Sequence, residues 1–442
     1  MATLTDIEVG GAQGAAATHT DSGAAGPIAS DVAGARPAVA FVVAQSGSRA
    51  NGGVESITQV LERLRGVRAV VVTQSETEFN RRWRGAGARV LVWPMPSLGP
   101  ASLLKNNLRM FRLVRAEGCR VVHCNDIYAL WQTAFGARAA GAAVVFNVRN
   151  VKPAGRRYGW RWRLALRLST RQLVLSKEMR EAFASRLGVE EPRAGVEYIY
   201  SAVDARRFSP VEATERAALR ERLGIGADCF AVGVVAAFEP RKGQLDLIRH
   251  GVASLRRLVP RARVYFVGDF APSRDEYARR CLAAAAEAGL CEAAEAGPCG
   301  AEEAGLPEAL GAGPGGSLTG GAVSFVGHRA EVAEWYRALD AVVVASQNEG
   351  LARCMIESLA CGTPVVSFDV CSAREILEGR GCGLVVVSGD YDALAGALAS
   401  LAADAEGRAR LGARGVAAAR ELFDPSEVVR GYERLYLSLG GN

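Results

Sequence analysis

The chain has 442 residues, of which 49% are hydrophobic and 23% charged, and its net charge is +6. This composition is typical of a globular protein with room for two domains and argues against a disordered chain. No apolar run reaches the roughly 18–20 residues that cross a bilayer, which argues against a transmembrane protein. The modest positive charge permits an anionic substrate or an anionic membrane surface, and it does not require nucleic acid.

The N-terminal segment and the cysteines bear on where the protein works. Residues 1–36 are rich in Ala, Gly, Thr and Ser, which predicts a disordered tail. They lack the basic start and the compact apolar core of a secretory signal, so we expect a cytoplasmic protein. The ten cysteines form no Cys-x2-Cys pair and only four histidines are present. We therefore expect reduced, mostly buried thiols and no zinc site.

From Pro37 onward, short Val-rich runs alternate with longer helical patterns. The strands expected in this part are 38–44, 69–73, 89–93, 120–123, 143–148 and 173–176. After a turn-rich stretch at 201–210 the pattern restarts. The strands expected there are 230–236, 263–268, 323–327, 341–345, 365–368 and 383–387. Continuous apolar strands between helices predict parallel sheets covered on both faces. Two doubly wound halves joined near residue 205 are the simplest interpretation, with ligands beyond the carboxyl ends of the strands.

Three further segments have a distinct composition. Residues 291–321 are rich in Ala, Gly and Glu, which predicts a flexible surface insertion. Residues 423–442 predict a final amphipathic helix. Residues 149–171 hold eight basic residues and no acid, interleaved with aromatic side chains at 158, 160 and 162. Such a segment suits a peripheral contact with an anionic membrane, although a solvated helix with core-facing aromatics is slightly favoured.

The most informative stretch is 349–366, which reads EGLARCMIESLACGTPVV. Glu349 precedes an expected helix and Glu357 lies on it, eight residues or roughly 12 Å further at the helical rise. That distance is about the reach from the sugar to the ribose of an extended nucleotide-sugar. The backbone of Gly350, Leu351 and Ala352 is expected to open the helix, where free N–H groups and the helix dipole suit a diphosphate. On spacing alone, two ordinary surface acids are the more frequent explanation.

The full string changes that balance, because it resembles the Glu-x7-Glu donor-binding motif of the retaining glycosyltransferases of family 4. The resemblance implies a GT-B fold, with two Rossmann-like domains facing a central cleft. After the tail that composition predicts at 1–36, it implies an acceptor-side domain at 37–203 and a nucleotide-sugar-binding domain at 204–422 that contains the insertion 291–321. The helix at 423–442 would cross back to the first domain.

A basic loop in the second half is similar to the phosphate-binding loop of this family. The expected strand 230–236 leads into AFEPRKG at 237–243, where the family has G-R-[LF]-x-P-x-K-G. Lys242 falls on the family's lysine, which grips the donor phosphates. The family's arginine position is Ala237 here, and Arg241 is the candidate to supply the missing charge.

Other donor contacts follow from the resemblance. Gly52 and Gly53 come after the first strand and match the glycine-rich loop that faces the donor. Gly327 and His328 match the loop whose backbone meets the nucleotide base. Asp390-Tyr-Asp392 looks like a metal-binding Asp-x-Asp motif, but Asp390 is better explained as a helix N-cap. No metal and no cofactor are expected.

On the acceptor side, the expected strand 120–123 leads into His123-Cys-Asn125-Asp126. Relatives often carry His-x-His here, so Asn125 replaces the second histidine and removes proton transfer at that position. By resemblance, these three polar residues contact the sugar or the acceptor, and His123 and Asn125 join Glu349 and Lys242 as candidate catalytic residues. A buried structural role for His123 is equally compatible with the sequence.

Together these features predict a retaining, metal-independent glycosyltransferase. It would move a hexose from a UDP- or GDP-linked sugar to a hydroxyl of a carbohydrate, lipid-linked or small-molecule acceptor, and would act in the cytoplasm or at the inner face of the membrane. Two alternatives stay open. One is a GT-B epimerase or phosphorylase, which the Glu-x7-Glu string disfavours. The other is a GT-B protein that binds a nucleotide-sugar or a partner without catalysis, which Ala237 and Asn125 motivate.

Overall fold

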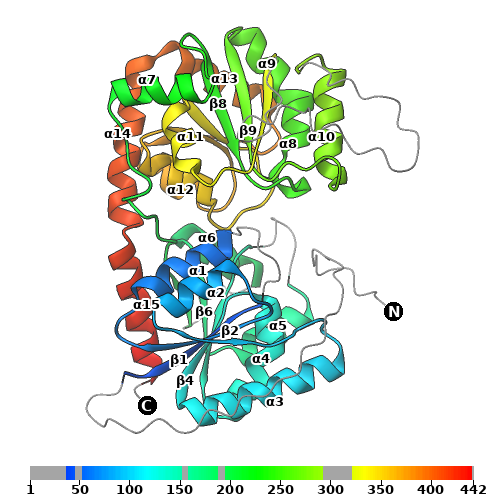
Figure 1. The fold of residues 1–442 in the computed structure, drawn as a ribbon, viewed down its shortest axis with the longest axis vertical. Coiled ribbons are helices and arrows are strands. Elements are labelled where there is room, and N and C mark those ends of the chain that lie inside the picture. Colours follow the sequence, from blue (N-terminus) through cyan, green and yellow to red (C-terminus); the bar gives the residue numbers. More distant parts are fainter. Residues whose placement is uncertain (1–35, 45–51, 152–157, 188–194, 292–320, 441–442) are drawn as a thin grey trace. The chain divides into compact units, whose positions relative to one another are not determined.

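The computed structural model describes residues 36–44, 52–151, 158–187, 195–291 and 321–440 (Figure 1). The predicted tail, most of the glycine-rich loop before Gly52 and nearly all of the insertion 291–321 lie outside the described residues. Residues 37–442 form one unit by their internal contacts.

The first sheet has the strand order β3-β2-β1-β4-β5-β6-β7, and all of its pairs are parallel. Its strands are β1 (Ala38–Val43), β2 (Arg68–Thr73), β3 (Arg89–Val92), β4 (Cys119–Cys124), β5 (Ala143–Asn147), β6 (Arg171–Val174) and β7 (Val196–Tyr198). The helices between them are α1 (Gly52–Arg63), α2 (Glu78–Gly85), α3 (Pro100–Glu117), α4 (Ile127–Ala139), α5 (Trp160–Leu168) and α6 (Lys177–Leu187).

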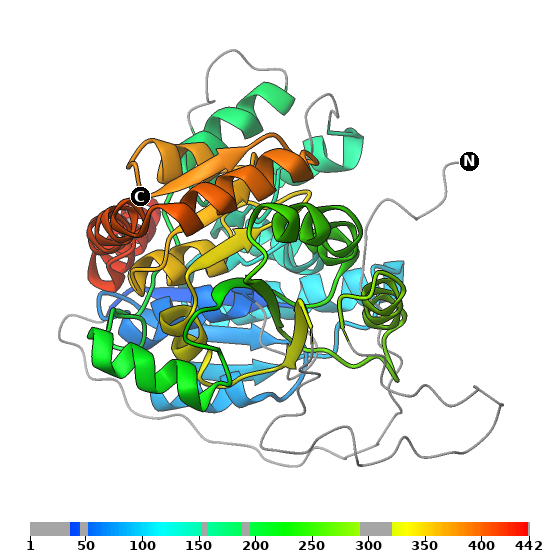
Figure 2. The same cartoon turned by 90° about the horizontal axis from the view of Figure 1, so that it is seen from above.

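The second sheet is also fully parallel, in the order β10-β9-β8-β11-β12-β13. Its strands are β8 (Phe230–Val235), β9 (Ala262–Val267), β10 (Val323–Gly327), β11 (Ala341–Val344), β12 (Val365–Phe368) and β13 (Gly383–Val386). Its helices are α7 (Ala213–Arg222), α8 (Gln244–Asp246), α9 (Val252–Leu258), α10 (Glu276–Glu287), α11 (Val332–Ala338), α12 (Arg353–Ala360), α13 (Tyr391–Ala403) and α14 (Ala405–Leu422). Seen from above, this sheet has helices on both of its faces (Figure 2).

The prediction of two doubly wound parallel sheets is confirmed, with all twelve expected strands present within two residues of their expected ends. Strand β7, a three-residue strand at the edge of the first sheet, was not predicted. So short a run carries no alternation that separates a strand from a loop.

Strand β1 shows why continuous apolar runs occur here. All six of its residues are buried. Ala38, Ala40 and Val42 belong to one hydrophobic cluster, whereas the alternate residues belong to a second cluster on the opposite face. Because successive side chains of a strand point to opposite faces, a sheet covered on both sides requires apolar residues at every position.

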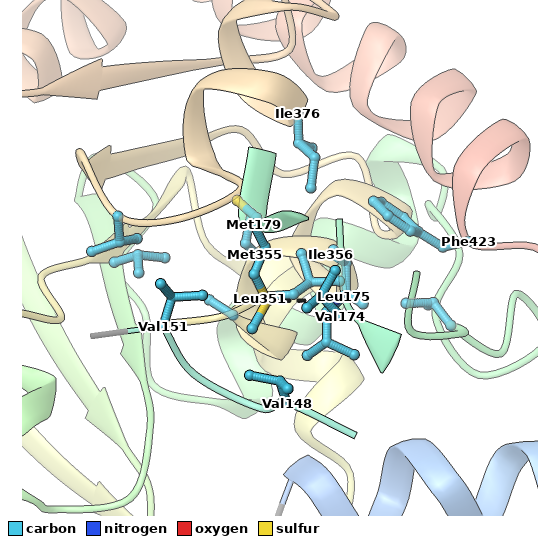
Figure 3. Packing of buried hydrophobic residues seen from close by; sticks show 14 of the residues in the cluster. Val148, Val151, Val174, Leu175, Met179, Leu351, Met355, Ile356, Ile376 and Phe423 are labelled. Carbon is cyan, nitrogen blue, oxygen red and sulfur yellow. Dashed lines mark hydrogen bonds between the residues drawn. The ribbon is translucent and has the colours of Figure 1, made fainter. Parts of the chain in front are cut away.

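One hydrophobic cluster crosses from the first half of the chain to the second (Figure 3). It joins residues such as Val148 and Met179 from the first half to Leu351 and Met355 from the second. The last helix, α15 (Pro425–Gly440), contacts α1 and β4 of the first half. The described residues contain no helix that is long and apolar enough to cross a membrane.

Candidate active site

Most of the predicted site residues follow strands at the two points where the strand order reverses, whereas Gly327 and His328 follow β10 at the edge of the second sheet. In the first sheet β1 and β4 are neighbours, and in the second sheet β8 and β11 are neighbours. Loops leaving the carboxyl ends of such strand pairs diverge, which opens a crevice where ligands of doubly wound folds bind. Gly53 follows β1, Asn125 follows β4, Lys242 follows β8 and Glu349 follows β11. The topology therefore explains why four loops far apart in sequence carry the candidate residues.

Lys242 and Glu349 are in direct contact. The Lys242 ammonium donates to Glu349 Oε1, and the Ser346 hydroxyl donates to the same oxygen at 2.9 Å. The side chain of Glu349 is 8% exposed and that of Lys242 is 15% exposed, so the pair is largely removed from water. Partial burial strengthens the attraction between the two charges. The structure thus brings together the anionic and the cationic residue predicted for the second half.

Arg241 adds a second cation to this pair. Its guanidinium Nη1 lies 3.5 Å from Glu349 Oε1, and its Nε lies 2.7 Å from Glu239. Ala237, which stands at the family's arginine position, is exposed. The extra positive charge therefore reaches Glu349 from Arg241, four residues further along the loop.

Glycines hold these loops close together. Gly243 has a φ of +73°, a conformation that a side chain disfavours. A Cβ at Gly350 would lie 2.0 Å from the backbone oxygen of Arg149, so only glycine fits where the first half touches the Glu349 loop. Gly350 and Leu351 were expected to open the helix. That detail is wrong: α12 begins at Arg353, with Ala352 as its N-cap. Ala352 has no side-chain oxygen to cap the first N–H groups of the helix.

Glu357 is engaged by protein groups on both carboxylate oxygens. Arg353 donates to Oε1 at 3.0 and 2.8 Å, and the Tyr336 hydroxyl donates to Oε2 at 3.1 Å. Arg353 also donates to the backbone oxygen of Ala202 at 3.3 Å. Glu357 is therefore tied to the segment that joins the two halves. A carboxylate has about four lone-pair sites, so capacity for a further hydrogen bond remains.

The charges of Lys242, Glu349 and Glu357 all act on the Cys354 thiol. Burial raises the pKa of this thiol to about 12. The two carboxylates raise the pKa of Cys354, whereas the Lys242 ammonium lowers it. All three charges therefore lie near enough to Cys354 to influence its thiol.

Arg149 is the principal residue that sequence reasoning did not single out. Its guanidinium donates to the side-chain oxygen of Asn125, to the backbone oxygen of Asn125 at 3.2 Å and to the backbone oxygen of Gly53 at 2.6 Å. Burial lowers the pKa of Arg149. It forms no ion pair with a carboxylate within the described part of the chain. The side-chain oxygen of Asn125 therefore accepts a hydrogen bond from Arg149. The Arg149 guanidinium is a cation of the first half that is held by neutral oxygens.

His123 lies deep in the first half, with no exposed surface. Its Nδ1 is 3.1 Å from the Tyr436 hydroxyl of α15, and its ring packs 5.6 Å from that of Phe41. Burial, and to a smaller extent the nearby Arg149 charge, lowers the pKa of His123 to about 3. The ring is therefore neutral at ordinary pH. This placement favours the structural alternative, and a direct contact of His123 with sugar stays a prediction.

Asp126 is the N-cap of α4, and its carboxylate accepts from the backbone N–H of Ala129 at 2.7 Å. Burial raises its pKa. Gly327 ends β10 with a φ of +79°, and the following His328 is exposed. Asp390 caps α13 through the N–H of Ala393 at 2.8 Å, which confirms the N-cap interpretation.

A second contact between the halves lies at the start of α6. The Glu375 carboxylate accepts from the N–H of Glu178 at 2.6 Å and from the Tyr200 hydroxyl, and Glu178 accepts from the N–H of Glu375 at 3.2 Å. Ser372 donates to the backbone oxygen of Gly350 at 2.6 Å. The φ of Ser372 is +74°, a conformation that glycine adopts without strain and serine does not. These bonds hold the Gly350 loop in place from the second half.

One cavity lies away from these residues. It has a volume of about 540 Å³ and contains none of the predicted donor contacts. Its lining residues are Glu62, Arg63, Arg65, Asp204, Ala205, Arg206, Asp424, Pro425 and Ser426. The lining mixes both charges and includes the Arg63–Asp204 ion pair at 2.9 Å, so we assign it no ligand.

Two family models match the chain. The model described as a glycosyl transferase 4-like domain matches residues 51–201, and the model described as glycosyl transferases group 1 matches residues 318–417. Together they cover more than half of the 442 residues. The chain belongs to the group 1 glycosyltransferases of the family 4 type, and it is an enzyme with the GT-B fold.

Individual relatives support this assignment. The GDP-mannose-dependent alpha-(1-6)-phosphatidylinositol monomannoside mannosyltransferase of Mycobacterium tuberculosis is 27% identical over 381 residues, which are 82% of this chain and 89% of the relative. A D-inositol 3-phosphate glycosyltransferase of Stackebrandtia nassauensis is 31% identical over 217 residues, 48% of this chain and 42% of the relative. The structure of Anabaena HepE in complex with UDP and glucose matches with a TM-score of 0.71 at 20% identity, over 90% of this chain and 99% of that one.

Proposed function

We propose that this enzyme is a retaining glycosyltransferase that moves a hexose from a nucleotide diphosphate sugar to an acceptor hydroxyl without a metal ion. The observation that carries the proposal is the contact of Lys242 with Glu349 at the carboxyl ends of the neighbouring strands β8 and β11. A departing diphosphate needs positive charge, and a hexose needs a hydrogen-bonding anchor. Lys242 would supply the positive charge and Glu349 the hydrogen-bonding anchor, and the two side chains are in contact.

The cations around the pair suit a diphosphate leaving group. Lys242 and Arg241 both approach Glu349 Oε1. A bound diphosphate would therefore replace this carboxylate as the anionic partner of the two cations. Glu349 would then be released to accept from the sugar hydroxyls, and Glu357 would accept from the ribose. Because protein cations stabilise the leaving group in this scheme, no divalent ion is required.

Arg149 extends the scheme to the first half. Its guanidinium is held by neutral oxygens, and its backbone oxygen touches Gly350. Among the described residues no carboxylate forms an ion pair with this cation, so it would attract an anionic group of the donor or of the acceptor.

The relatives narrow the donors and acceptors to test first. The mycobacterial relative uses GDP-mannose and acts on a phosphatidylinositol monomannoside, and the HepE structure holds UDP and glucose. We therefore propose GDP-mannose as the first donor and a glycosylated lipid as the first acceptor.

The test is release of nucleoside diphosphate from a panel of GDP- and UDP-linked sugars, with the anomeric configuration of the product read by NMR. We expect transfer from at least one donor, retention of the α-configuration, and unchanged turnover with EDTA. Tight donor binding with no release would instead favour the non-catalytic alternative. An inverted product or a loss of activity with EDTA would contradict the retaining or the metal-independent part of the proposal.

A further inference from the structure

Exposed apolar side chains gather on three consecutive helices of the first half. Among the described residues, ten large hydrophobic side chains are exposed, and half of them lie on α3, α4 and α5. These five are Leu104, Leu108, Phe111, Phe135 and Trp160. Leu104 is 73% exposed and Trp160 is 70% exposed. Single exposed apolar residues are ordinary, whereas a cluster marks an interaction surface.

Helix α3 has two apolar sides. Its inner side carries Met110, Leu113 and Val114, which are buried in the core of the first half. Leu104, Leu108 and Phe111 follow one another at intervals of four and three residues, so they form a single outer stripe. The inner side explains how the helix packs on the sheet. The outer stripe stays exposed in the part of the chain that the structure describes, so packing on the sheet does not account for it.

The three helices cover the same face of the first sheet (Figure 1). The connections from β3 to β4, from β4 to β5 and from β5 to β6 all run in the same direction along the sheet. Right-handed crossovers in one direction place their helices on one face. Helix α3 also packs along α4, and α4 contacts α5.

This surface is also strongly basic. The three helices contain eight basic residues and a single acid, Glu117, which pairs with Arg68 and Arg89 at the end of α3. The exposed cations are Lys105, Arg112, Arg115, Arg138, Arg161, Arg163 and Arg167. None of these seven forms an ion pair in the described part of the chain. The excess charge of the three helices exceeds the net +6 of the whole protein. We call the five apolar and seven basic residues the α3–α5 face.

We propose that the α3–α5 face docks the enzyme on an anionic lipid bilayer. Apolar tips among unpaired cations match an interface in which acyl chains lie beneath negative headgroups. A second copy of the chain would bring seven cations against seven like charges. Nucleic acid would use the cations and leave the apolar stripe of α3 unused. The bilayer is the partner that uses both sets of residues.

The proposed surface differs from the one that the sequence indicated. In the sequence, residues 149–171 were the candidate for such a contact, although a solvated helix with core-facing aromatics was slightly favoured. Trp162 instead packs against Tyr158 and Phe146, with ring centroids 4.6 and 5.7 Å apart, and only Trp160 of the three points outward. The main apolar contribution comes from α3, which sequence reasoning did not connect with a membrane.

Vesicle co-sedimentation of the full chain tests the proposal. We expect strong binding to phosphatidylcholine vesicles that contain phosphatidylglycerol, weak binding to pure phosphatidylcholine, and weaker binding as salt is raised. The variants L104Q/L108Q/F111Q and R112E/R115E should each lower the affinity by about tenfold or more. All five side chains are exposed, so the fold should tolerate both variants.

The matched controls lie on α9 of the second half, where Leu258 is 58% exposed and Arg256 is exposed. L258Q and R256E should bind vesicles as the native chain does. Failure of the native chain to bind anionic vesicles would overturn the proposal, as would binding that survives both α3 variants. A dimer in sedimentation velocity that the α3 variants dissolve would assign the face to a second copy instead. Vesicle binding needs no sugar donor, so this result is separate from the test of the glycosyltransferase activity.

Discussion

The proposed chemistry depends on one carboxylate oxygen, Oε1 of Glu349. Three groups, from Lys242, Arg241 and Ser346, converge on Oε1. Such convergence explains why an acidic residue stands at this point of the loop. It also makes the contributions of the individual groups separable by substitution.

Substitution of the pair should affect turnover far more than folding. We expect Lys242→Ala and Glu349→Gln each to lower kcat/KM by about 10²–10³-fold. The first variant removes a charge that stabilises the leaving diphosphate, and the second weakens a hydrogen-bonding anchor for the sugar, and both interactions are strongest in the transition state. Lys242→Ala should cost less stability than Glu349→Ala, since Arg241 remains 3.5 Å from the carboxylate. Steady-state kinetics and thermal unfolding measure the two effects.

The control for this pair is Arg257→Ala, which removes an exposed ion pair with Asp392 at 3.9 Å. Exposed pairs contribute little, so native turnover and stability are expected. Native kcat/KM in both Lys242→Ala and Glu349→Gln would remove them from the mechanism.

His123 should make the protein sensitive to acid. Its pKa is about 3 when folded, mainly because of burial, and about 6.5 when unfolded. Between these values the unfolded chain takes up a proton that the folded chain does not. Stability is therefore fully present above pH 6.5 and is lost as the pH falls toward 3, at up to about 1.4 kcal/mol per pH unit.

The comparison that isolates this effect is unfolding by denaturant between pH 5 and 7. His123→Gln should be less stable than the native chain at pH 7 but should lose less stability on acidification. His328→Gln, at an exposed position, should keep the native pH dependence. Equal slopes for the native chain and His123→Gln would contradict the buried neutral histidine.

At the scale of elements, the contact between the Glu349 loop and the first half is set by one glycine. A methyl group at Gly350 would overlap the Arg149 carbonyl, and backbone cannot yield as a flexible side chain does. We expect Gly350→Ala to separate the loops and to lower kcat/KM by about 10–100-fold, because a displacement of about 1 Å in a positioned site has effects of that order.

Gly396→Ala provides the matched control. Gly396 is exposed on α13, and apart from its chain neighbours and the backbone of its own helix no described atom lies within 4 Å of the place that an added methyl group would take. This change should leave activity intact and stabilise the helix by about 0.5–1 kcal/mol. Gly350→Ala with native kinetics would show that the halves need not touch at this point during turnover.

Features that lie within one local segment could be predicted from the sequence, and contacts between distant segments could not. Sequence could single out Glu349 and Glu357 because both lie within one local loop-and-helix string, and their roles stay predictions. The strands were predictable from their apolar runs. Arg149 was not predictable, because its place in the site depends on hydrogen bonds to Gly53 and Asn125, which lie on other loops. The burial of His123 depends on Tyr436, 313 residues away on α15. Contacts of that separation leave no local periodicity.

At the level of the whole molecule, we propose that loops from both sheets hold one donor. The switch points of the two sheets carry the cations, the acids and the glycines, and a shared hydrophobic cluster joins the halves beside them (Figure 3). Substrate identity is then left to loops that vary freely on this scaffold. The lipid-facing surface proposed on α3–α5 lies on the first half, where the acceptor is expected.

The strongest test of this proposal is a structure of the enzyme with a bound nucleotide-sugar. We predict the diphosphate within hydrogen-bond distance of Lys242, the hexose on Glu349 and the ribose on Glu357. The contact between Lys242 and Glu349 should be exchanged for contacts with the ligand. A donor bound elsewhere, with the Lys242–Glu349 contact intact, would contradict the proposal.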